Sequence, residues 1–364
     1  MIIKKLELTD FRNYVNLDID LSEKVNIFFG NNAQGKTNIL EAIYLCCTTR
    51  SQKRSHDREM IRFGEEEAHL KMCFQKSSLD RKIDIHLLKN KTKRIAVDGI
   101  PVTKATEIYG MMNIISFSPD DLSIVKEGPA ERRNFIDMEL CQLDREYMFC
   151  LSSYNRALMQ RNNLLKQIQL NNSLRSTLDI WDEQVYGFGK TIIERRSRFV
   201  DDLNKIAAPI HNKLTDGEEN LVIRYVPNSP ASELQNNIFM SRDRDIATKM
   251  SNVGPHRDDI ECIINGDNAR TYGSQGQQRT VALTLKLAEI DLVKQSVKDN
   301  PVLLLDDVLS ELDRNRQNQL LNNISGIQTI ITCTGLEEFI SERLRCDKIF
   351  KVEQGVVTEI NRKD

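Results

Sequence analysis

The sequence predicts a layered α/β domain that is interrupted by a mainly helical insertion. In the first and last thirds of the 364-residue chain, strand-like and helix-like segments alternate, which is the pattern of an α/β layered fold. The middle, from about residue 132 to residue 214, is rich in helix formers and shows no clear strand pattern. We therefore expect one discontinuous domain over residues 1–130 and 215–364, with residues 131–214 inserted as a helical arm subdomain.

The first third is expected to hold several strands and one helix. Leu6, Leu8 and Phe11 alternate with polar residues, as in a half-buried strand. Other segments are rich in β-branched and aromatic residues, and helical spacing of apolar residues follows a Gly/Asn-rich loop. The further strands expected are 17–21, 25–30 and runs within 69–98 that end at an Asp98-Gly99 turn, and the expected helix is 37–47.

The middle third is expected to form two antiparallel helices. Leu151, Leu158 and Leu165 share one heptad position, and Asn171-Asn172 interrupts the pattern before a second helical stretch over 174–205. Each helix should span at most about 30 residues, or roughly 45 Å. These lengths favour a subdomain that packs on its neighbour over a long projecting coiled coil.

The final third returns to alternation. The expected elements are a strand near 259–264, a helix over 277–293, a strand over 302–305, a helix near 313–323, a strand over 329–332 and a closing hairpin over 349–360.

Composition excludes several classes of protein. Lys and Arg number 51 against 53 Asp and Glu, so the bulk basic excess of a histone-like protein is absent, although a local basic patch for DNA is not excluded. The longest apolar run, 42–47, is far too short to span a bilayer. Charges interrupt the N-terminus where a signal peptide needs an apolar stretch, and the eight cysteines show no Cys-x-x-Cys spacing. We expect a reduced, cytoplasmic protein with no membrane partner.

The segment Gly30-Asn31-Asn32-Ala33-Gln34-Gly35-Lys36-Thr37 matches the phosphate-binding P-loop pattern in its required place, after an apolar strand and before a helix. Glycines let backbone N–H groups turn toward phosphate, and the helix N-terminus adds partial positive charge. Lys36 is expected to reach the β- and γ-phosphates of ATP, and Thr37 to offer its hydroxyl to Mg²⁺.

An acidic strand end provides the second half of a nucleotide site. The apolar run 302–305 leads into Asp306 and Asp307, and such a strand delivers carboxylates to the carboxyl edge of a parallel sheet. Asp306 is expected on the Mg²⁺ side and Asp307 beside the attacking water, as the polarising base. A buried strand capped by two solvated acids is the alternative, which the P-loop makes less favoured.

The sequence Ser274-Gln-Gly276-Gln opens the helix expected over 277–293. Alone it reads as an N-cap. However, it follows the P-loop and precedes the acidic strand, and Ser310-Glu-Leu-Asp313 comes directly after that strand. This order resembles the Walker A, signature, Walker B and D-loop set of ABC-type ATPases.

Further segments closely resemble the RecF family of bacterial DNA replication and repair proteins, which belongs with the SMC and Rad50 ATPases but lacks their long coiled coils. The resemblance runs from residue 1 to about residue 360. The segments that carry it are 11–14, 35–44, 118–122, 126–133, 254–259 and 304–313.

The resemblance implies an ABC-type ATPase head, with a mixed sheet and flanking helices, whose active site is shared between two subunits. ATP held by one P-loop would be capped by Ser274 and Gly276 of a second subunit, so ATP would act mainly as a dimerisation switch with weak, DNA-stimulated hydrolysis. It also implies binding to single-stranded, gapped or junction DNA, cooperation with RecO and RecR, assistance in loading RecA, and a part in the SOS response. Arg12 matches the family position that reaches the nucleotide; a surface arginine in a turn is the alternative.

Some positions depart from the ABC pattern. Ser118-Pro119-Asp120 stands where a Q-loop glutamine is usual, so a metal ligand from that loop is in doubt. Thr334 stands near the usual switch histidine, and a hydroxyl cannot replace an imidazole in acid–base chemistry. For His256, structural hydrogen bonding is the favoured interpretation over catalysis.

DNA contacts are indicated only by clusters of basic residues, which by default are solvated surface charges. The two clusters are Arg50, Lys53, Arg54 and Arg58, and Arg195, Arg196 and Arg198. The alternative functions are an ATPase subunit of another SMC/Rad50-like or transporter system, and a pure ATP switch without turnover. The second carboxylate, Asp307, argues against the pure switch.

Overall fold

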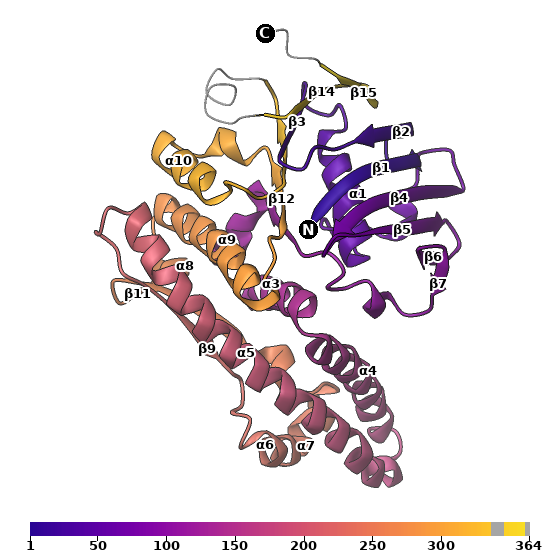
Figure 1. The fold of residues 1–364 in the computed structure, drawn as a ribbon. Coiled ribbons are helices and arrows are strands. Elements are labelled where there is room, and N and C mark those ends of the chain that lie inside the picture. Colours follow the sequence, from indigo (N-terminus) through magenta and orange to yellow (C-terminus); the bar gives the residue numbers. More distant parts are fainter. Residues whose placement is uncertain (336–345, 361–364) are drawn as a thin grey trace. The chain divides into compact units, whose positions relative to one another are not determined.

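The computed structural model describes residues 1–335 and 346–360 (Figure 1). The chain divides into two compact units, one formed by residues 1–121 with 289–364 and the other by residues 122–288. Each unit has its own sheet and helices. Among the described residues, no helix is both long and apolar enough to cross a membrane.

The first unit contains an antiparallel sheet in the order β2-β1-β4-β5-β6-β7. In β1, Leu6, Leu8 and Phe11 are buried while Glu7 and Thr9 are not, which confirms the predicted alternation. Asp98 and Gly99 both have positive φ, as the predicted tight hairpin between β6 and β7 requires. The strands are β1 (Ile2–Phe11), β2 (Tyr14–Asp20), β4 (Glu67–Lys76), β5 (Leu79–Leu88), β6 (Lys91–Val97) and β7 (Ile100–Val102).

A second sheet of this unit has the order β15-β14-β3-β13-β12-β8, and all its pairings are parallel except β14 with β15. Its central strands are buried and mainly apolar because both faces are covered. The predicted strands 302–305 and 329–332 and the closing hairpin are confirmed. The strands are β3 (Val25–Phe29), β8 (Ile114–Phe117), β12 (Val302–Asp306), β13 (Thr329–Cys333), β14 (Lys348–Glu353) and β15 (Val356–Glu359).

Helix α1 (Lys36–Thr48) packs against strands of both sheets. It is buried on nearly all sides, including Leu40, Ile43 and Cys47, as expected of a helix between two sheets. The other helical segments described in the first unit are η1 (Asp57–Glu59), η2 (Ala105–Glu107), η3 (Pro119–Asp121), the end of α9 (Gln275–Val297), η6 (Val308–Glu311) and α10 (Arg314–Asn323).

The second unit is mainly helical and also carries a small antiparallel sheet, β11-β10-β9. Its elements are α2 (Leu122–Lys126), α3 (Pro129–Leu143), α4 (Arg145–Ile168), η4 (Asn172–Thr177), α5 (Leu178–Leu214), β9 (Leu221–Val226), α6 (Leu234–Met240), α7 (Arg242–Thr248), η5 (Pro255–Arg257), β10 (Asp259–Ile264), β11 (Asp267–Asn268), α8 (Ala269–Tyr272) and most of α9 (Gln275–Val297).

Helices α4 and α5 form the predicted antiparallel pair. Arg195 of α5 binds Glu146 near the start of α4, whereas Arg161 near the end of α4 binds Asp182 near the start of α5. The predicted limit of about 30 residues is wrong for α5, which has 37 residues. Pro209 does not end this helix, because Pro209 and Lys205 are both exposed and water can hydrogen-bond the Lys205 carbonyl that proline leaves unpaired.

The unit boundary differs from the expected one, since residues 215–288 group with the helical arm. Strand β9 lies against α5, where Asn204 accepts a hydrogen bond from the Ile223 N–H at 2.7 Å. His211 of α5 lies 3.0 Å from the Thr284 hydroxyl on α9. These contacts tie both sequence-distant segments to the long helix.

The segment 254–259 joins the elements of this unit. Arg196, 2 % exposed, donates to Asp258 and Asp137, and Arg132 forms a two-pronged ion pair with Asp259. The strong resemblance in this segment therefore coincides with a buried ionic network that positions helices α3 and α5.

Candidate nucleotide site

The P-loop backbone leaves no room for a side chain at its two glycines. A Cβ on Gly30 would lie 2.3 Å from the Val352 carbonyl oxygen, and a Cβ on Gly35 would lie 2.4 Å from the Asn13 side chain. Gly35 has φ of 114°, in the region that favours glycine, and it immediately precedes α1. The two glycines thus meet a steric need, and the loop leads directly into a helix N-terminus.

Residues outside the P-loop pattern hold the loop in place. Asn13 donates to the Gln34 carbonyl at 2.9 Å, and the Tyr14 hydroxyl donates to the Gly35 carbonyl at 3.0 Å. From the β14–β15 turn, the backbone N–H groups of Gln354 and Gly355 donate to the side-chain and main-chain oxygens of Gln34. The sequence analysis missed these supports, because they come from both ends of the chain.

Lys36 and Thr37 open helix α1. The Lys36 ammonium is 4 % exposed and donates to the carbonyl oxygens of Gly30 and Asn31, at 2.6 and 3.1 Å. The Thr37 hydroxyl donates to Asp306 Oδ1 at 2.9 Å. The structure therefore brings together the predicted phosphate-binding lysine and the two predicted metal ligands.

Thr332, at the end of β13, organises the acidic pair. Its hydroxyl donates to Asp306 Oδ1 at 2.7 Å and accepts a hydrogen bond from the Asp307 N–H at 3.1 Å. The sequence analysis considered Thr334 instead, which is exposed. Thr332, and not Thr334, lies beside the acidic pair because Thr332 pairs directly with Asp306 across the parallel strands. The strand register that creates this pairing cannot be read from either segment alone.

The surroundings and backbone conformation of Asp307 are energetically unfavourable. Its Oδ1 is buried without a hydrogen-bond partner among the described residues, and its φ of 53° lies in the left-handed region. Burial raises the pKa of Asp307 above its ordinary value, nearby Lys36 opposes the shift, and Asp306 adds to it. Unpaired buried carboxylates and left-handed non-glycine residues concentrate at functional sites.

These residues fit a nucleotide with a divalent cation. Thr37 and Asp306 supply the oxygen ligands that Mg²⁺ prefers, and the buried Lys36 supplies a positive charge beside the P-loop backbone. The unpartnered oxygen of Asp307 is an acceptor available to a water molecule.

Arg12 is engaged with protein groups. It has positive φ and makes a bidentate ion pair with Glu41, with both N···O distances at 2.8 Å. Glu41 is only 2 % exposed. Arg12 also donates to the Glu59 carbonyl and the Ser55 hydroxyl. The guanidinium, about one-fifth exposed, therefore joins α1 to the basic segment that follows it, and its expected nucleotide contact stays a prediction.

Ser274 and Gly276 belong to the second unit. The Ser274 hydroxyl accepts from the Gln277 N–H at 3.2 Å, and Gln277 Oε1 accepts from the Ser274 N–H at 2.8 Å. This reciprocal pair is a capping box at the N-terminus of α9. The N-cap interpretation is thus confirmed for Ser274, and a role in a shared active site stays a prediction.

The other positions considered from the sequence have structural partners. At η3, the Ser118 N–H donates to the Asp121 carboxylate and the Asp121 N–H donates to the Ser118 carbonyl, which closes a turn. His256 accepts from the Tyr154 hydroxyl at 2.6 Å when its Nε2–H donates to the Ser251 carbonyl at 3.0 Å. Burial lowers the pKa of His256 to about 4. The interpretation of His256 as structural is confirmed by these contacts.

The two basic clusters differ. Arg196 is buried in ion pairs and Arg195 binds Asp144 and Glu146, so the second cluster presents mainly Arg198 to solvent. In the first cluster all four side chains are exposed; these are Arg50, Lys53, Arg54 and Arg58.

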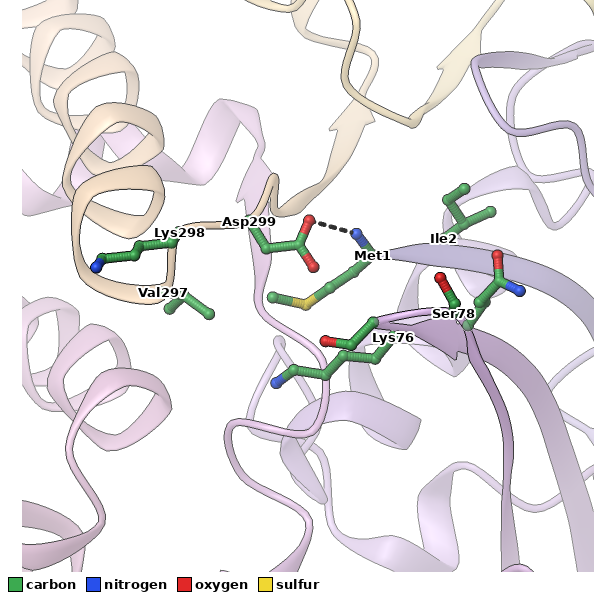
Figure 2. Close-up of a pocket in the computed structure, with 9 residues that line it drawn as sticks. Met1, Ile2, Lys76, Ser78, Val297, Lys298 and Asp299 are labelled. Atoms are coloured by element: carbon green, nitrogen blue, oxygen red, sulfur yellow. Dashed lines mark hydrogen bonds and ion pairs between the residues drawn. The ribbon is translucent and has the colours of Figure 1, made fainter.

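A pocket of about 430 Å³ lies elsewhere in the first unit (Figure 2). Its walls come from the start of β1, the β4–β5 turn and the end of α9, and the Met1 ammonium binds Asp299 there at 2.9 Å. None of its lining residues belongs to the nucleotide motifs.

Comparison with known proteins gives consistent matches over the whole chain. The family model described as RecF/RecN/SMC N terminal domain matches residues 2–358. The DNA replication and repair protein RecF of Lachnoclostridium phytofermentans is 57 % identical over 357 residues, covering 98 % of this chain and 99 % of the relative. The protein of the same name from Clostridium acetobutylicum is 43 % identical, with 99 % and 100 % covered.

Solved structures agree. A structure of the recombination mediator protein RecF-ATP in the RecFOR pathway aligns with a TM-score of 0.93 at 34 % identity, covering 99 % of this chain and 98 % of that one. An Smc head domain from Pyrococcus furiosus aligns with a TM-score of 0.56 at 18 % identity, covering 99 % and 96 %; this is a likeness of fold alone. The predicted ABC-type head fold is confirmed, and residues 1–335 and 346–360 contain no extended coiled coil like the one in the name of the Smc structure.

Proposed function

Because this chain belongs to the RecF family, within the RecF/RecN/SMC N-terminal group, we propose that it is an ATP-dependent DNA-binding protein of recombinational repair and replication. The observation that carries the proposal is the grouping of Lys36, Thr37, Asp306 and Asp307 at one edge of the parallel sheet. In this proposal the protein binds single-stranded or gapped DNA as an ATP-induced dimer, cooperates with RecO and RecR in loading RecA, and thereby contributes to the SOS response.

Each residue of the site has a distinct task in this proposal. Thr37 and Asp306 hold Mg²⁺, which neutralises phosphate charge when it is bound. Thr332 keeps Asp306 oriented through its hydroxyl. Lys36 exchanges the carbonyl oxygens of its own loop for phosphate oxygens.

Asp307 acts on the water molecule that attacks the γ-phosphate. Its unpartnered Oδ1 accepts a hydrogen bond from that water, and burial, which raises the pKa of Asp307, strengthens the carboxylate as a proton acceptor. With Asp307 the only base in this proposal and no Q-loop glutamine, hydrolysis is slow.

The position of the signature residues supports the proposed dimer. Ser274 is the N-cap of a 23-residue helix and Gly276 lies in its first turn, where the helix dipole and backbone N–H groups favour an anion. In the proposed dimer they face the nucleotide on the partner's P-loop, so ATP becomes part of the interface and stabilises it.

Mass measurement with and without ATP tests this dimer. We expect ATP to convert the wild type from monomer to dimer, Asp307→Asn to trap the dimer because hydrolysis is lost, and Lys36→Met to remain monomeric. A thermal melt of each variant without nucleotide serves as the folding control. If all three proteins had the same mass with and without ATP, the dimer proposal would be wrong.

We propose that the four exposed basic residues after α1 contact DNA phosphates. The alternative cluster on α5 has two of its three arginines engaged in ion pairs. The test is DNA affinity as a function of salt for a triple alanine variant of Arg50, Lys53 and Arg58. A triple alanine variant of Lys166, Lys190 and Arg198, all exposed residues of the helical arm, is the control with the same change in net charge.

We expect the first variant to bind more weakly and its salt dependence to fall by about one unit of slope per lost phosphate contact, with the control unchanged. Equal losses in both variants would assign the effect to net charge. An ATPase rate that is the same with and without DNA would contradict the DNA role itself.

A further inference from the structure

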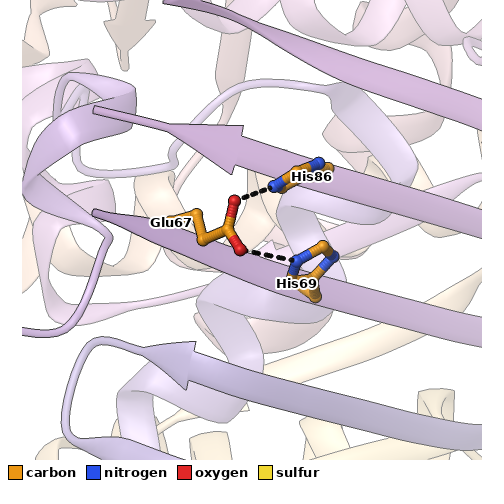
Figure 3. Close-up of side chains that lie close together, drawn as sticks. All are labelled: Glu67, His69 and His86. Atoms are coloured by element: carbon orange, nitrogen blue, oxygen red, sulfur yellow. Dashed lines mark hydrogen bonds and ion pairs between the residues drawn. The ribbon is translucent and has the colours of Figure 1, made fainter. Parts of the chain in front are cut away.

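Two histidines and a glutamate lie together on the exposed face of the first unit's antiparallel sheet (Figure 3). His69 of β4 pairs directly with His86 of β5. Glu67 precedes His69 by two residues, so strand geometry places both on the same face. The opposite face carries the buried Ala68 and Leu70. Burial of these two side chains determines that Glu67 and His69 point to the exposed face.

The ligand-type atoms of the cluster converge. His86 Nε2 lies 2.9 Å from one Glu67 carboxylate oxygen, and His69 Nε2 lies 3.8 Å from the other. The two imidazole rings stack with centroids 3.9 Å apart, and one nitrogen or oxygen from each residue fits within a span of 4.8 Å. Ligands bound at about 2.0–2.2 Å around one tetrahedral ion stand roughly 3.4 Å apart, so small side-chain rotations close the gap.

We propose that Glu67, His69 and His86 form a binding site for a divalent transition-metal ion, with Zn²⁺ as the best fit. Two imidazole nitrogens and one carboxylate suit Zn²⁺ and its neighbours, whereas Mg²⁺ and Ca²⁺ prefer sites built from oxygen alone. This set differs in ligands and position from the Thr37–Asp306 pair of the nucleotide site.

The site leaves coordination positions open. It provides three protein ligands, and the side chains of Glu67 and His69 are about half exposed, so a water molecule or another ligand completes the coordination. His69 and His86 also line a cavity of about 540 Å³ whose wall includes Lys71 and Arg94.

Binding changes the protonation of the cluster. His86 Nε2 must carry the proton in its hydrogen bond to Glu67, because the ionised carboxylate only accepts. The metal takes the lone pair of this nitrogen, so the proton moves to Nδ1 or to solvent.

The test is titration of ZnCl₂ into nucleotide-free, chelator-treated protein, followed by calorimetry. We expect one ion per chain at roughly micromolar affinity. His69→Ala and His86→Ala each should weaken binding at least tenfold, and Glu67→Gln should weaken it less. His56→Ala, an exposed histidine outside the cluster, and Cys73→Ser should leave it unchanged. All sites of change are solvent-accessible, and melting curves without metal check that each variant folds.

Titration with Co²⁺ identifies the ligand type independently. The proposal predicts visible absorption without the intense sulfur-to-metal band that a thiolate ligand produces. Wild-type affinity weaker than about 100 µM, unchanged binding in both histidine variants, or a strong thiolate band would each overturn the proposal.

Discussion

Replacing Asp307 with asparagine should stabilise the nucleotide-free protein while abolishing hydrolysis. The Asp307 carboxylate has one buried oxygen without a partner, and burial raises its pKa. Keeping a charged group buried with an unpartnered oxygen costs about 1–3 kcal/mol or more, and asparagine removes the charge that makes this desolvation unfavourable. Because the carboxyl group is only partly buried, we take the lower end, about 1 kcal/mol.

Asparagine suits this position for a second reason. The φ of 53° at Asp307 is one that asparagine tolerates better than most residues, so the change removes the charge without adding backbone strain. The expected gain of about 1 kcal/mol corresponds to a rise of roughly 2–4 °C in melting temperature for a unit of this size.

The assay is thermal and denaturant unfolding of both proteins at neutral pH, without nucleotide and with chelator present. Asp307→Ala is the matched control: it also removes the charge but places alanine at a left-handed φ, so it should gain less than Asp307→Asn. If Asp307→Asn unfolded at lower temperature or denaturant concentration than the wild type, the view of Asp307 as a strained functional residue would be refuted.

Three further changes test other parts of the structure. Thr332→Val, which removes the hydroxyl donated to Asp306, should weaken Mg²⁺-dependent ATP binding by about 1.5–3 kcal/mol in equilibrium titrations; unchanged magnesium dependence would remove Thr332 from the site. Arg196→Met leaves buried carboxylates uncompensated and should cost about 3–5 kcal/mol in unfolding free energy, whereas the exposed Arg198→Met should cost almost nothing; equal effects would argue against the buried network. The pKa of His256 is lowered from 6.5 to about 4, so its stabilising contribution is complete above pH 6.5 and is lost as the pH falls toward 4; His256→Gln should lose less stability than the wild type over that interval, and parallel curves would contradict this.

The nucleotide motifs could be recognised in the sequence because the spacing of their residues is local. Gly30 and Gly35 both have positive φ, which is a local requirement of the turn, and Lys36 and Thr37 follow at fixed spacing. The apolar run ending in Asp306 was recognisable because a parallel strand buried on both faces must be continuously apolar.

Other features depended on contacts between distant segments. Nothing in the sequence distinguishes Thr332 from other threonines at strand ends, because its contact with Asp306 depends on the pairing of β13 with β12. The ion pair of Arg12 with Glu41 likewise joins residues 29 positions apart in the sequence. Strand β9 alternates clearly, with Leu221 and Ile223 buried and Val222 exposed, and the period-2 pattern was a signal that the sequence analysis missed.

The central claim is that the active site is shared between two subunits, and a mixing experiment tests it most directly. Lys36→Met disables the P-loop, and Ser274→Asp keeps an N-cap residue but places a negative charge where the signature would meet phosphate. Each variant alone should lack ATPase activity. If the site is shared, an equal mixture should regain activity, up to about half of the wild-type level, because each mixed dimer has one intact site of two. A mixture as inactive as its two components would contradict the account.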